Sequence, residues 1–267
     1  MKTNICLWSV LLLTQALAVS AQVPAGFASK PTFDEEFTEN ALHTATWKQR
    51  GLGVRNHCVN TPDAIRVHDG YATITTYSTL ESGVPTNYCG MITTDGTFSQ
   101  KYGYWETAVR FHAVPGFQCA FWVQSSTIGS MIGHAENSGT EMDVFEHLAQ
   151  AKEKQYDHAI HWDGYGPAHK HVVSHQELDT FDDGKFHVFG VAWTPSGYTF
   201  YVDGKVSYEV SPSEVPVSAI PEYIILSSEV PRAFPAEGFG SKQNSQATFD
   251  IDYVRVYPYK PHKESAK

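Results

Sequence analysis

Three carboxylates stand close together in the segment Glu-Met-Asp-Val-Phe-Glu, which occupies residues 141–146. On an α-helix, where each residue turns by about 100°, Glu141 and Asp143 would point to nearly opposite sides. On a β-strand these two side chains share one face, and the residues between the acids point to the other. Glu146 then has the wrong parity, unless one extra residue is accommodated near Phe145. The segment therefore predicts a strand with a β-bulge that turns Glu146 to the face of the other two acids.

Carboxylates gathered in a partly dry site can act as nucleophile and general acid, because like charges raise the pKa of at least one of them. Hydrolysis of a glycosidic bond uses one carboxyl group in each of these two roles. A retaining enzyme holds its two working carboxyl groups about 5–5.5 Å apart, and an inverting enzyme leaves a wider gap for water. Glu141 and Glu146 on one side of a single strand favour the narrower gap. A solvated strand edge or a set of calcium ligands would use the same residue types, but the apolar residues between the acids disfavour a solvated strand.

Residues 1–21 have the pattern of a cleavable secretory signal, with Lys2, an apolar run at 7–13 and small residues that end at Ala21. We therefore predict secretion or export to a periplasm, with cleavage near Ala21. No segment reaches the roughly 18 apolar residues of a membrane helix, so no membrane span is expected. Removing Lys2 with the signal reduces the 19 basic residues to 18, which against 29 acidic residues gives a net charge of −11. This acidity disfavours nucleic acid as a partner.

The chain after the signal contains three cysteines, which are Cys58, Cys89 and Cys119. In an oxidising compartment, one disulfide and one free thiol are the simplest account of this odd number. Cys58 and Cys89 lie in loop-like or strand-start contexts, whereas Cys119 lies inside an apolar run without charges. We predict a disulfide between Cys58 and Cys89 and an unreactive core thiol at Cys119.

The remaining sequence is dominated by patterns typical of β-strands. Alternating or β-branched runs occur at 64–67, 71–77, 103–111, 119–123, 141–146, 155–162, 186–193, 199–202, 223–226 and 247–257. Asp203-Gly204 between two such runs indicates a two-residue hairpin turn. Without a long amphipathic helix or a domain-scale linker, this spacing predicts an all-β antiparallel sandwich. Residues 22–259 are expected to form one domain, and the polar end of the chain, 260–267, a disordered tail.

Several segments resemble, in the same order, those of glycoside hydrolase family 16. The acidic segment resembles the E-x-D-x-x-E motif of this family in its bulged form, which occurs in laminarinases, agarases and porphyranases. The other similar segments are 33–37 with Trp47, 102–106, 120–122, 186–195, 200–205 and 252–257. Colinear motifs over a whole domain are more specific than one hexapeptide. The resemblance implies a jelly-roll β-sandwich of the concanavalin A type, with a substrate cleft on its concave sheet. Cys58 and Cys89 also resemble the disulfide positions of some lichenases.

The same resemblance implies catalytic roles for the three acids. Glu141 is similar to the nucleophile, and Glu146 to the acid/base that protonates the leaving oxygen and then activates water. Asp143 is similar to the aspartate that holds the nucleophile and modulates both pKa values. No cofactor is required for this chemistry.

Five further residues are candidates for contacts with sugar. Open glycan clefts present aromatic rings and polar groups to the sugar. Trp122 has opposite parity to the apolar residues beside it, and the family places an aromatic residue here in the cleft, so we favour the cleft over the core. His161 and Trp162 resemble a His-aromatic-Gly segment beside the catalytic strand; His161 could also make a structural hydrogen bond alone. Ser227 and Glu229 share one face of their strand, where lichenases carry Asn and Trp, so Glu229 disfavours lichenase specificity.

Two possible metal sites have less support. His169 and His171, with His175 beyond them, have the same-face spacing of a zinc pair, but no third ligand is evident and a solvated loop is the preferred interpretation. Asp252, with the backbone near Gly70, resembles the structural calcium site of the family on the convex face. Trp105 and Trp193 are assigned to the core.

These observations predict a secreted, monomeric, retaining endo-β-glycosidase that cleaves internal β-linkages of a polysaccharide or glycan. The bulged motif favours β-1,3-glucan of the laminarin type or a β-1,4-linked galactan, among them agar, porphyran, keratan and mucin-type chains; mixed-linkage glucan is the further alternative. A non-catalytic glycan-binding module on the same fold is the alternative from another class, although such modules are expected to lack the catalytic acids. A transglycosylase would differ only in the acceptor.

Overall fold

The computed structural model of the protein describes residues 22–81, 83–112, 114–150, 152, 154–181, 183–232 and 237–261. The predicted signal peptide, 1–21, and residues 262–267 of the predicted tail lie outside the described residues. Within the described part, the secondary structure consists of strands, one α-helical turn, α1 (Ala135–Ser138), and one 3-10 turn (Pro62–Ala64). No helix in these ranges is long and apolar enough to cross a membrane.

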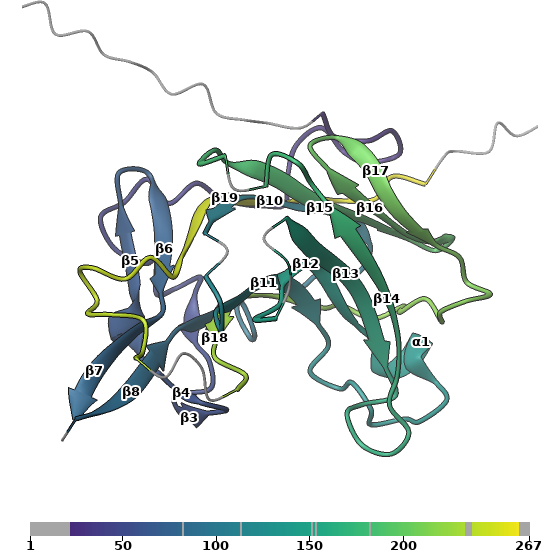
Figure 1. Ribbon diagram of the computed structural model, residues 1–267. Helices are drawn as coiled ribbons and strands as arrows, with labels where there is room; N and C mark the ends of the chain where they lie inside the picture. Colours follow the sequence, from purple (N-terminus) through teal and green to yellow (C-terminus); the bar gives the residue numbers. More distant parts are fainter. Residues whose placement is uncertain are drawn as a thin grey trace, which may run out of the picture.

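Two large antiparallel sheets form stacked layers, and a smaller sheet extends from them at the lower left of Figure 1. The first large sheet has the order β17 (Lys205–Val210), β16 (Gly197–Val202), β15 (His187–Thr194), β10 (Gly103–Phe111), β19 (Thr248–Tyr257), β6 (Tyr71–Thr75) and β5 (Ile65–His68), with β1 (Phe33–Glu35) also on β19. The second has the order β14 (Lys170–Glu177), β13 (Gln155–Trp162), β12 (Glu141–His147), β11 (Gln118–Gln124), β18 (Tyr223–Glu229), β9 (Met91–Thr93) and β2 (Lys48–Gln49). The smaller sheet has the order β3 (Gly53–Arg55), β4 (Cys58–Asn60), β8 (Val84–Cys89) and β7 (Tyr77–Glu81).

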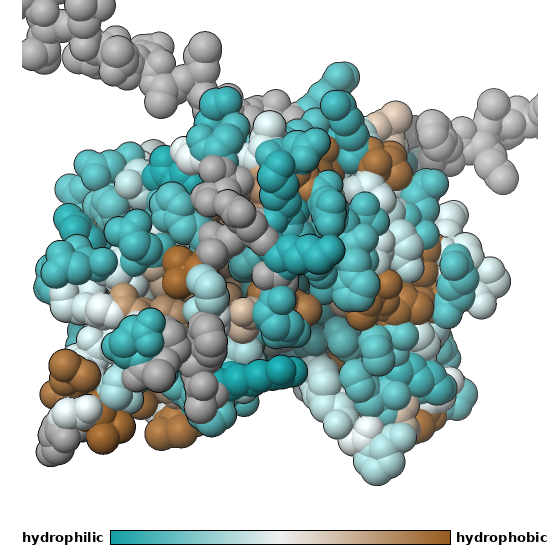
Figure 2. Space-filling view, viewed as in Figure 1, coloured by the Kyte–Doolittle hydropathy of each residue, from teal (hydrophilic) through white to brown (hydrophobic). Residues whose placement is uncertain are grey.

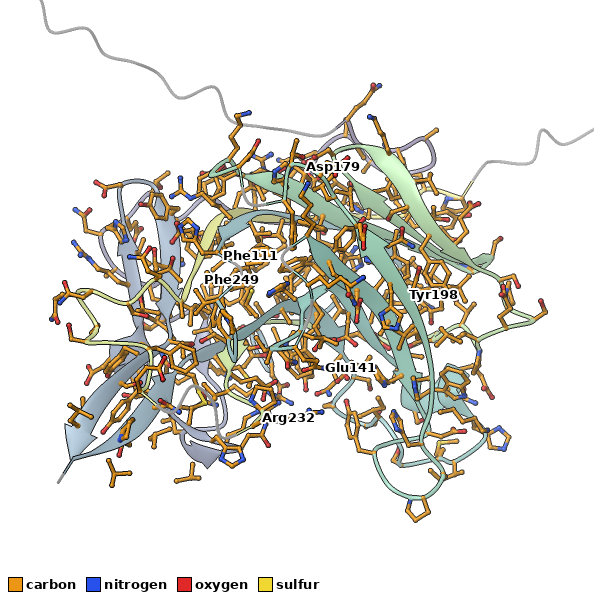
Figure 3. The ribbon with its side chains drawn as sticks, viewed as in Figure 1. Phe111, Glu141, Asp179, Tyr198, Arg232 and Phe249 are labelled. Atoms are coloured by element: carbon orange, nitrogen blue, oxygen red, sulfur yellow. A yellow bond between two sulfur atoms is a disulfide. The ribbon has the colours of Figure 1, made fainter. Side chains whose placement is uncertain are left out.

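The main core is a cluster of large apolar side chains contributed by both large sheets. Phe145 of the second sheet packs against Phe189 of the first, with ring centroids 4.4 Å apart. Phe111 and Phe249, labelled in Figure 3, belong to the same cluster. Burial of apolar surface is the dominant favourable contribution to folding, and aromatic rings bury a large area each. The antiparallel sandwich predicted from the strand pattern is confirmed, and Trp105 and Trp193 are fully buried as expected.

The predicted hairpin at Asp203-Gly204 is confirmed. Val202 pairs with Lys205, so the two residues between them form the whole turn. Both have positive φ, 49° for Asp203 and 76° for Gly204. This is the backbone conformation of a type I′ turn, whose twist matches that of the strands it joins.

His169 lies in the connection before β14, but the segment with His171 and His175 is not the solvated loop that the sequence suggested. Residues Lys170–Glu177 form β14, which pairs with β13 along its whole length. The strand lies at the edge of its sheet and carries polar side chains on both faces. The hydrogen-bonded ladder with β13 stabilises β14 and requires no alternation of apolar residues. For this reason no pattern in the sequence predicted the strand.

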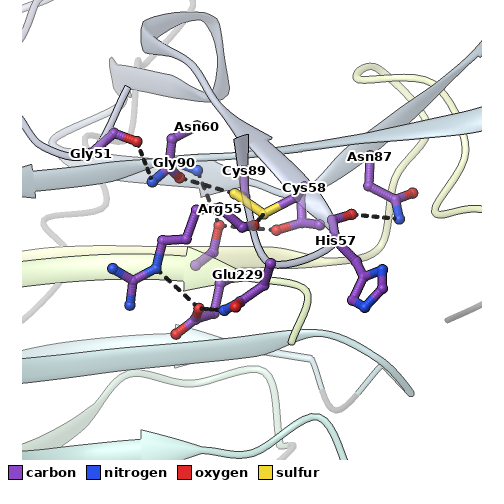
Figure 4. Close-up of a disulfide and its surroundings, with 12 residues drawn as sticks. Gly51, Arg55, His57, Cys58, Asn60, Asn87, Cys89, Gly90 and Glu229 are labelled. Carbon is purple, nitrogen blue, oxygen red and sulfur yellow. Dashed lines mark hydrogen bonds and ion pairs between the residues drawn. A yellow bond between two sulfur atoms is a disulfide. The ribbon is translucent and has the colours of Figure 1, made fainter. Parts of the chain in front are cut away.

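The predicted disulfide between Cys58 and Cys89 is present, and Cys119 is a buried free thiol. The disulfide joins β4, in the hairpin that carries Arg55, to β8, and Figure 4 shows it close to Arg55. Outside the core, most of the visible surface is hydrophilic, and exposed apolar residues gather near the ends of β7, β8 and β3, at the lower left of Figure 2. Those residues are Val54, Leu80 and Val84.

Candidate active site

The β-bulge predicted in the acidic strand is present in β12. On one side, Phe121 pairs with Phe145 and Trp122 with Asp143, so Val144 has no opposite residue in β11. Val144 and Phe145 both point into the core and are fully buried. Two consecutive residues on the core side restore Glu146 to the other face. The carbonyl of Val144, which the bulge displaces from the ladder, accepts a hydrogen bond from the His158 ring.

All three acids of β12 line one cavity of about 250 Å³, on the face of the second sheet that points away from the main core. Glu141 lies well apart from the core residues Phe111 and Phe249 in Figure 3. β12 contributes the acids from the middle of the sheet, and the flanking strands supply the walls. The lining residues are Arg55, Ala120, Trp122, Glu141, Asp143, Glu146, His161, Ser227 and Glu229.

Glu141 is held by two hydrogen-bond donors. The Nε2 atom of Gln124 lies 2.6 Å from Oε2 of Glu141, and the hydroxyl of Tyr165 donates to the same oxygen. The amide of Gln124 is oriented by Arg50 and Tyr223, which donate to its Oε1 at 2.8 Å each. Because both lone-pair directions of Oε1 are occupied in this way, the amide nitrogen faces Glu141.

Glu146 has surroundings that favour its protonated form. Its Oε1 accepts one hydrogen bond, at 2.7 Å, from Nε2 of Gln118. Burial, followed by the charges of Asp143 and Glu141, raises the pKa of Glu146 well above its usual range, and Glu229 adds to this effect. Carboxyl groups in such surroundings retain a proton near neutral pH and can donate it.

Glu141 ionises more readily than Glu146. Burial and the charge of Asp143 raise the pKa of Glu141 to about 7, while the hydrogen bond from Tyr165, the charge of His161 and the hydrogen bond from Gln124 oppose the rise. These three groups stabilise the carboxylate form of Glu141, and Glu146 has no comparable set among the described residues. The site can therefore hold an ionised Glu141 beside a protonated Glu146.

Asp143 lies between the two glutamates in the strand and forms an ion pair with His161. The Nε2 atom of His161 is 3.1 Å from Oδ2 of Asp143. Burial disfavours the charged ring, but the hydrogen bond to Asp143 and the charges of Asp143 and Glu141 raise the pKa of His161 overall. The Nδ1 atom of His161 lies 2.9 Å from Nε2 of His169, outside the cavity lining.

The structure brings four of the five predicted sugar contacts to the cavity. Trp122, His161, Ser227 and Glu229 all line it. The indole Nε1 of Trp122 donates to Oγ of Ser227 at 3.1 Å, and Trp122 belongs to a small apolar cluster separate from the main core. Trp162 does not line the cavity: it has the opposite parity to His161 and packs in the main core cluster. We therefore remove Trp162 from the candidate site.

Four residues of the site were not predicted from the sequence. Gln118 and Gln124 lie on the same face of β11 as Trp122, so the parity argument used for Trp122 would have found them. Tyr165 lies in the connection between β13 and β14, where no periodicity indicates the direction of a side chain. Arg55 lines the cavity from β3, a three-residue strand in a different sheet.

The structure does not confirm a calcium site at Asp252. Burial raises the pKa of its carboxyl, and the charged groups that act on it are the guanidinium groups of Arg255 and Arg110. No group of three side-chain ligands among the described residues includes Asp252. Calcium prefers six to eight oxygen ligands, often from several carboxylates. Asp252 is therefore a single side-chain ligand in this part of the structure, and calcium binding there stays a prediction.

The protein is an antiparallel sandwich with a cavity lined by carboxylates on one of its sheets. Comparison with known proteins identifies a family with which this description agrees. The family model of glycosyl hydrolases family 16 matches residues 53–255. Because this match covers most of the chain, the protein belongs to glycosyl hydrolases family 16.

The individual relatives share a quarter to a third of their aligned residues with this chain. The chain is 26% identical over 258 residues to glucan endo-1,3-beta-glucosidase A1 of Niallia circulans, covering 84% of this chain and 37% of that protein. It is 30% identical over 119 residues to the kappa-carrageenase of Pseudoalteromonas carrageenovora, covering 40% of this chain and 30% of that protein. The chain thus spans about a third of the length of these relatives. The endo-beta-1,3-glucanase structure from Pyrococcus furiosus is similar with a TM-score of 0.71 at 22% identity, covering 86% of this chain and 94% of that one. This likeness confirms the predicted jelly-roll fold.

Proposed function

We propose that this protein is a retaining endo-β-glycosidase that hydrolyses internal β-linkages of a polysaccharide or glycan. The observation that carries the proposal is the bulge of β12, which turns Glu146 toward the cavity that Glu141 and Asp143 also line. Two glutamates that project from one strand into one cavity are suited to the short separation of a retaining mechanism.

In the first step, the Glu141 carboxylate attacks the anomeric carbon, and Glu146 gives its proton to the oxygen that leaves. The glycosidic bond breaks, and the sugar becomes covalently attached to Glu141. In the second step, Glu146, now ionised, removes a proton from water, which attacks the same carbon and releases Glu141. This double displacement needs no cofactor. The raised pKa of Glu146 supports its role as the acid.

Asp143 and His161 assist these two glutamates. Asp143 raises the pKa of both glutamates through its charge. Its ion pair with His161 offsets part of the negative charge that three acids bring to one cavity. We assign Asp143 as a positioning residue, which acts on the reaction through the pKa values of Glu141 and Glu146.

The relatives and the cavity lining support a proposal for the substrate class. One relative is named for a β-1,3-glucan linkage and another for carrageenan. We propose a β-1,3-glucan or a β-1,4-galactan as substrate, bound by Trp122, His161, Ser227 and Glu229. The ring of Trp122 offers an apolar face, and the other three offer polar groups for sugar hydroxyls. The disulfide between Cys58 and Cys89 supports secretion of the protein, and we propose that it acts as a monomer.

The first experiment incubates the purified protein with laminarin, lichenan, agarose, porphyran, carrageenan, keratan sulfate and mucin glycans, and measures product size by chromatography. Internal cleavage gives a ladder of oligosaccharides from the matching polymer. Binding without release of products would contradict the enzyme proposal and favour a glycan-binding module. Products longer than the starting chains would instead indicate a transglycosylase.

The second experiment tests the roles of the acids on the polymer that is cleaved. Glu141→Ala and Glu146→Ala should each lower kcat by about 10³-fold or more, because each removes a group that acts in the transition state. Glu177→Ala, in the exposed edge strand β14, is the matched control and should retain activity. Activity of either catalytic variant within tenfold of wild type would overturn the assignment. NMR of the first product should show a retained anomeric configuration, and inversion would contradict the double displacement.

A further inference from the structure

Three imidazole rings meet beside the proposed active site, where β13 ends and β14 begins. His161 is the next-to-last residue of β13, His169 precedes β14, and His171 pairs with His161 across the two strands. This connection lies at the lower right of Figure 1. The ring centroids are separated by 5.1 Å for His161 and His169, 5.5 Å for His161 and His171, and 5.3 Å for His169 and His171. The three rings therefore form a nearly equilateral triangle.

The size of this triangle matches the coordination of a small divalent cation. A zinc ion lies about 2.0–2.1 Å from an imidazole nitrogen, so its distance from the ring centroid is about 3.2 Å, and at a tetrahedral angle two such centroids are about 5.2 Å apart. One nitrogen from each of the three rings lies within 4.8 Å of the others. The closest pair, Nδ1 of His161 and Nε2 of His169, is 2.9 Å apart. A cation bound by all three rings would replace this hydrogen bond, and the rings, whose planes lie within 23° of one another, would rotate to direct one nitrogen each toward the ion.

The ring of His161 already contacts a carboxylate in the way that is common for histidines that bind zinc. Histidine ligands of zinc commonly donate their other ring N–H to a carboxylate, which fixes the tautomer. Here Nε2 of His161 faces Oδ2 of Asp143 at 3.1 Å. In the neutral ring, which is the form that binds a metal, Nε2 donates to this carboxylate and Nδ1 carries the lone pair on the side of His169. Lys170, between the other two histidines, extends to Asp163 at 2.9 Å, so its positive charge is bound elsewhere. Asp163 also accepts from the backbone of Gly133, which ties the β13–β14 connection to the neighbouring loop.

We propose that His161, His169 and His171 bind one divalent cation of borderline softness, with Zn²⁺ as the representative ion. Three imidazoles leave the fourth tetrahedral position open to water, because His171 is exposed and the other two are half-buried. The cation would share His161 with Asp143 and thereby connect metal occupancy to the carboxylates of β12. This proposal does not depend on the substrate or on the catalytic roles proposed above.

The test measures Zn²⁺ binding by isothermal titration calorimetry on the full chain, expressed without a histidine tag and freed of metal by a chelator. We expect one Zn²⁺ per chain. His169→Ala and His171→Ala should each weaken the affinity by more than tenfold, since even loss of an outer-shell partner costs about 10–100-fold. His175→Ala is the matched control, because His175 lies on the same strand and bonds to Asp157 instead. It should bind like the wild type.

Glu141, Asp143 and His161 also form a compact group of possible ligands, so a Glu141→Gln variant distinguishes the two sites. Under the proposal this variant keeps its Zn²⁺ affinity, and Co²⁺ bound in place of Zn²⁺ gives the strong visible absorption of a four-coordinate site. Zn²⁺ binding that persists in both His169→Ala and His171→Ala overturns the proposal. Loss of binding in Glu141→Gln alone, or no binding by the wild type, also overturns it. Circular dichroism of each metal-free variant verifies the fold.

Discussion

The Nδ1 atom of His158 lies 2.7 Å from the carbonyl oxygen of Val144, and this contact secures the bulge of β12 from the neighbouring strand β13. The other ring nitrogen, Nε2, lies 2.8 Å from the hydroxyl of Ser207. Burial lowers the pKa of His158 to about 4, so the ring is neutral and has one N–H to donate. That N–H goes to the carbonyl, and Nε2 accepts from the serine. A histidine outside the cavity therefore contacts the bulge that determines the face on which Glu146 emerges.

Replacing His158 by leucine should disturb both stability and catalysis. The variant leaves the buried Val144 carbonyl without its donor, which costs about 1–3 kcal/mol of unfolding free energy. We also expect kcat to fall by at least tenfold while KM changes less, because misplacement of Glu146 affects the chemical step. Urea unfolding and steady-state kinetics measure the two effects. Ser207→Ala, which removes the partner on the far side of the ring, is the control and should retain kcat. Wild-type stability and kcat in His158→Leu would show that the bulge does not need this contact.

The activity of the protein should depend on pH through Glu141. This carboxyl must be ionised to act as nucleophile, and its pKa is raised to about 7 by burial and by Asp143. Below that pH the protonated form accumulates, so kcat/KM should fall about tenfold per unit. Tyr165→Phe removes a hydrogen bond to the charged form, which is worth about 1.5–3 kcal/mol when buried. Because Tyr165 is 56% exposed, we expect the acidic limb to move upward by about one pH unit.

Tyr223→Phe is the matched control for Tyr165→Phe. The hydroxyl of Tyr223 acts on Glu141 only through the amide of Gln124, so its loss should shift the acidic limb by less. A pH profile of kcat/KM for the three proteins provides the comparison. An acidic limb that stays in place in Tyr165→Phe would remove this hydroxyl from the control of the nucleophile.

Parity along the strands predicted the main features of the site, because carboxylates interrupt an otherwise apolar run only where a face leaves the core. The same rule separates His161 from Trp162, which are consecutive in β13 and point to opposite faces. Assigning both to sugar ignored that rule. Tyr165 could not be predicted in this way, since a connection between strands has no period. The partners of the His161 ring were also out of reach, because the strand β14 has polar residues on both faces and resembles a loop.

Glu229 and Arg55 should have opposite effects on the alkaline limb of the pH profile. The charge of Glu229 contributes to the raised pKa of Glu146, and Arg55 pairs with Glu229 at 3.2 Å. Glu229→Gln removes a negative charge, so Glu146 should lose its proton at lower pH and the alkaline limb should move down. Arg55→Ala leaves the charge of Glu229 less neutralised, so the limb should move up. The double variant should resemble Glu229→Gln alone. Shifts of the same sign in the two single variants would contradict this coupling.

The disulfide should hold the wall of the cavity as well as stabilise the fold. Cys58 and Cys89 are separated by 31 residues, and closing a loop of this length stabilises the folded state by about 3–4 kcal/mol in the chain-entropy model. Arg55 pairs with Cys58 in the β3–β4 hairpin, so the bond also fixes the strand that carries Arg55 to the cavity (Figure 4). The double variant Cys58→Ala/Cys89→Ala should therefore lose about this free energy and show a higher KM. Reductant should lower the Tm of the wild type and of Cys119→Ala, but not that of the double variant. An unchanged KM in the double variant would mean that the hairpin keeps its place without the disulfide.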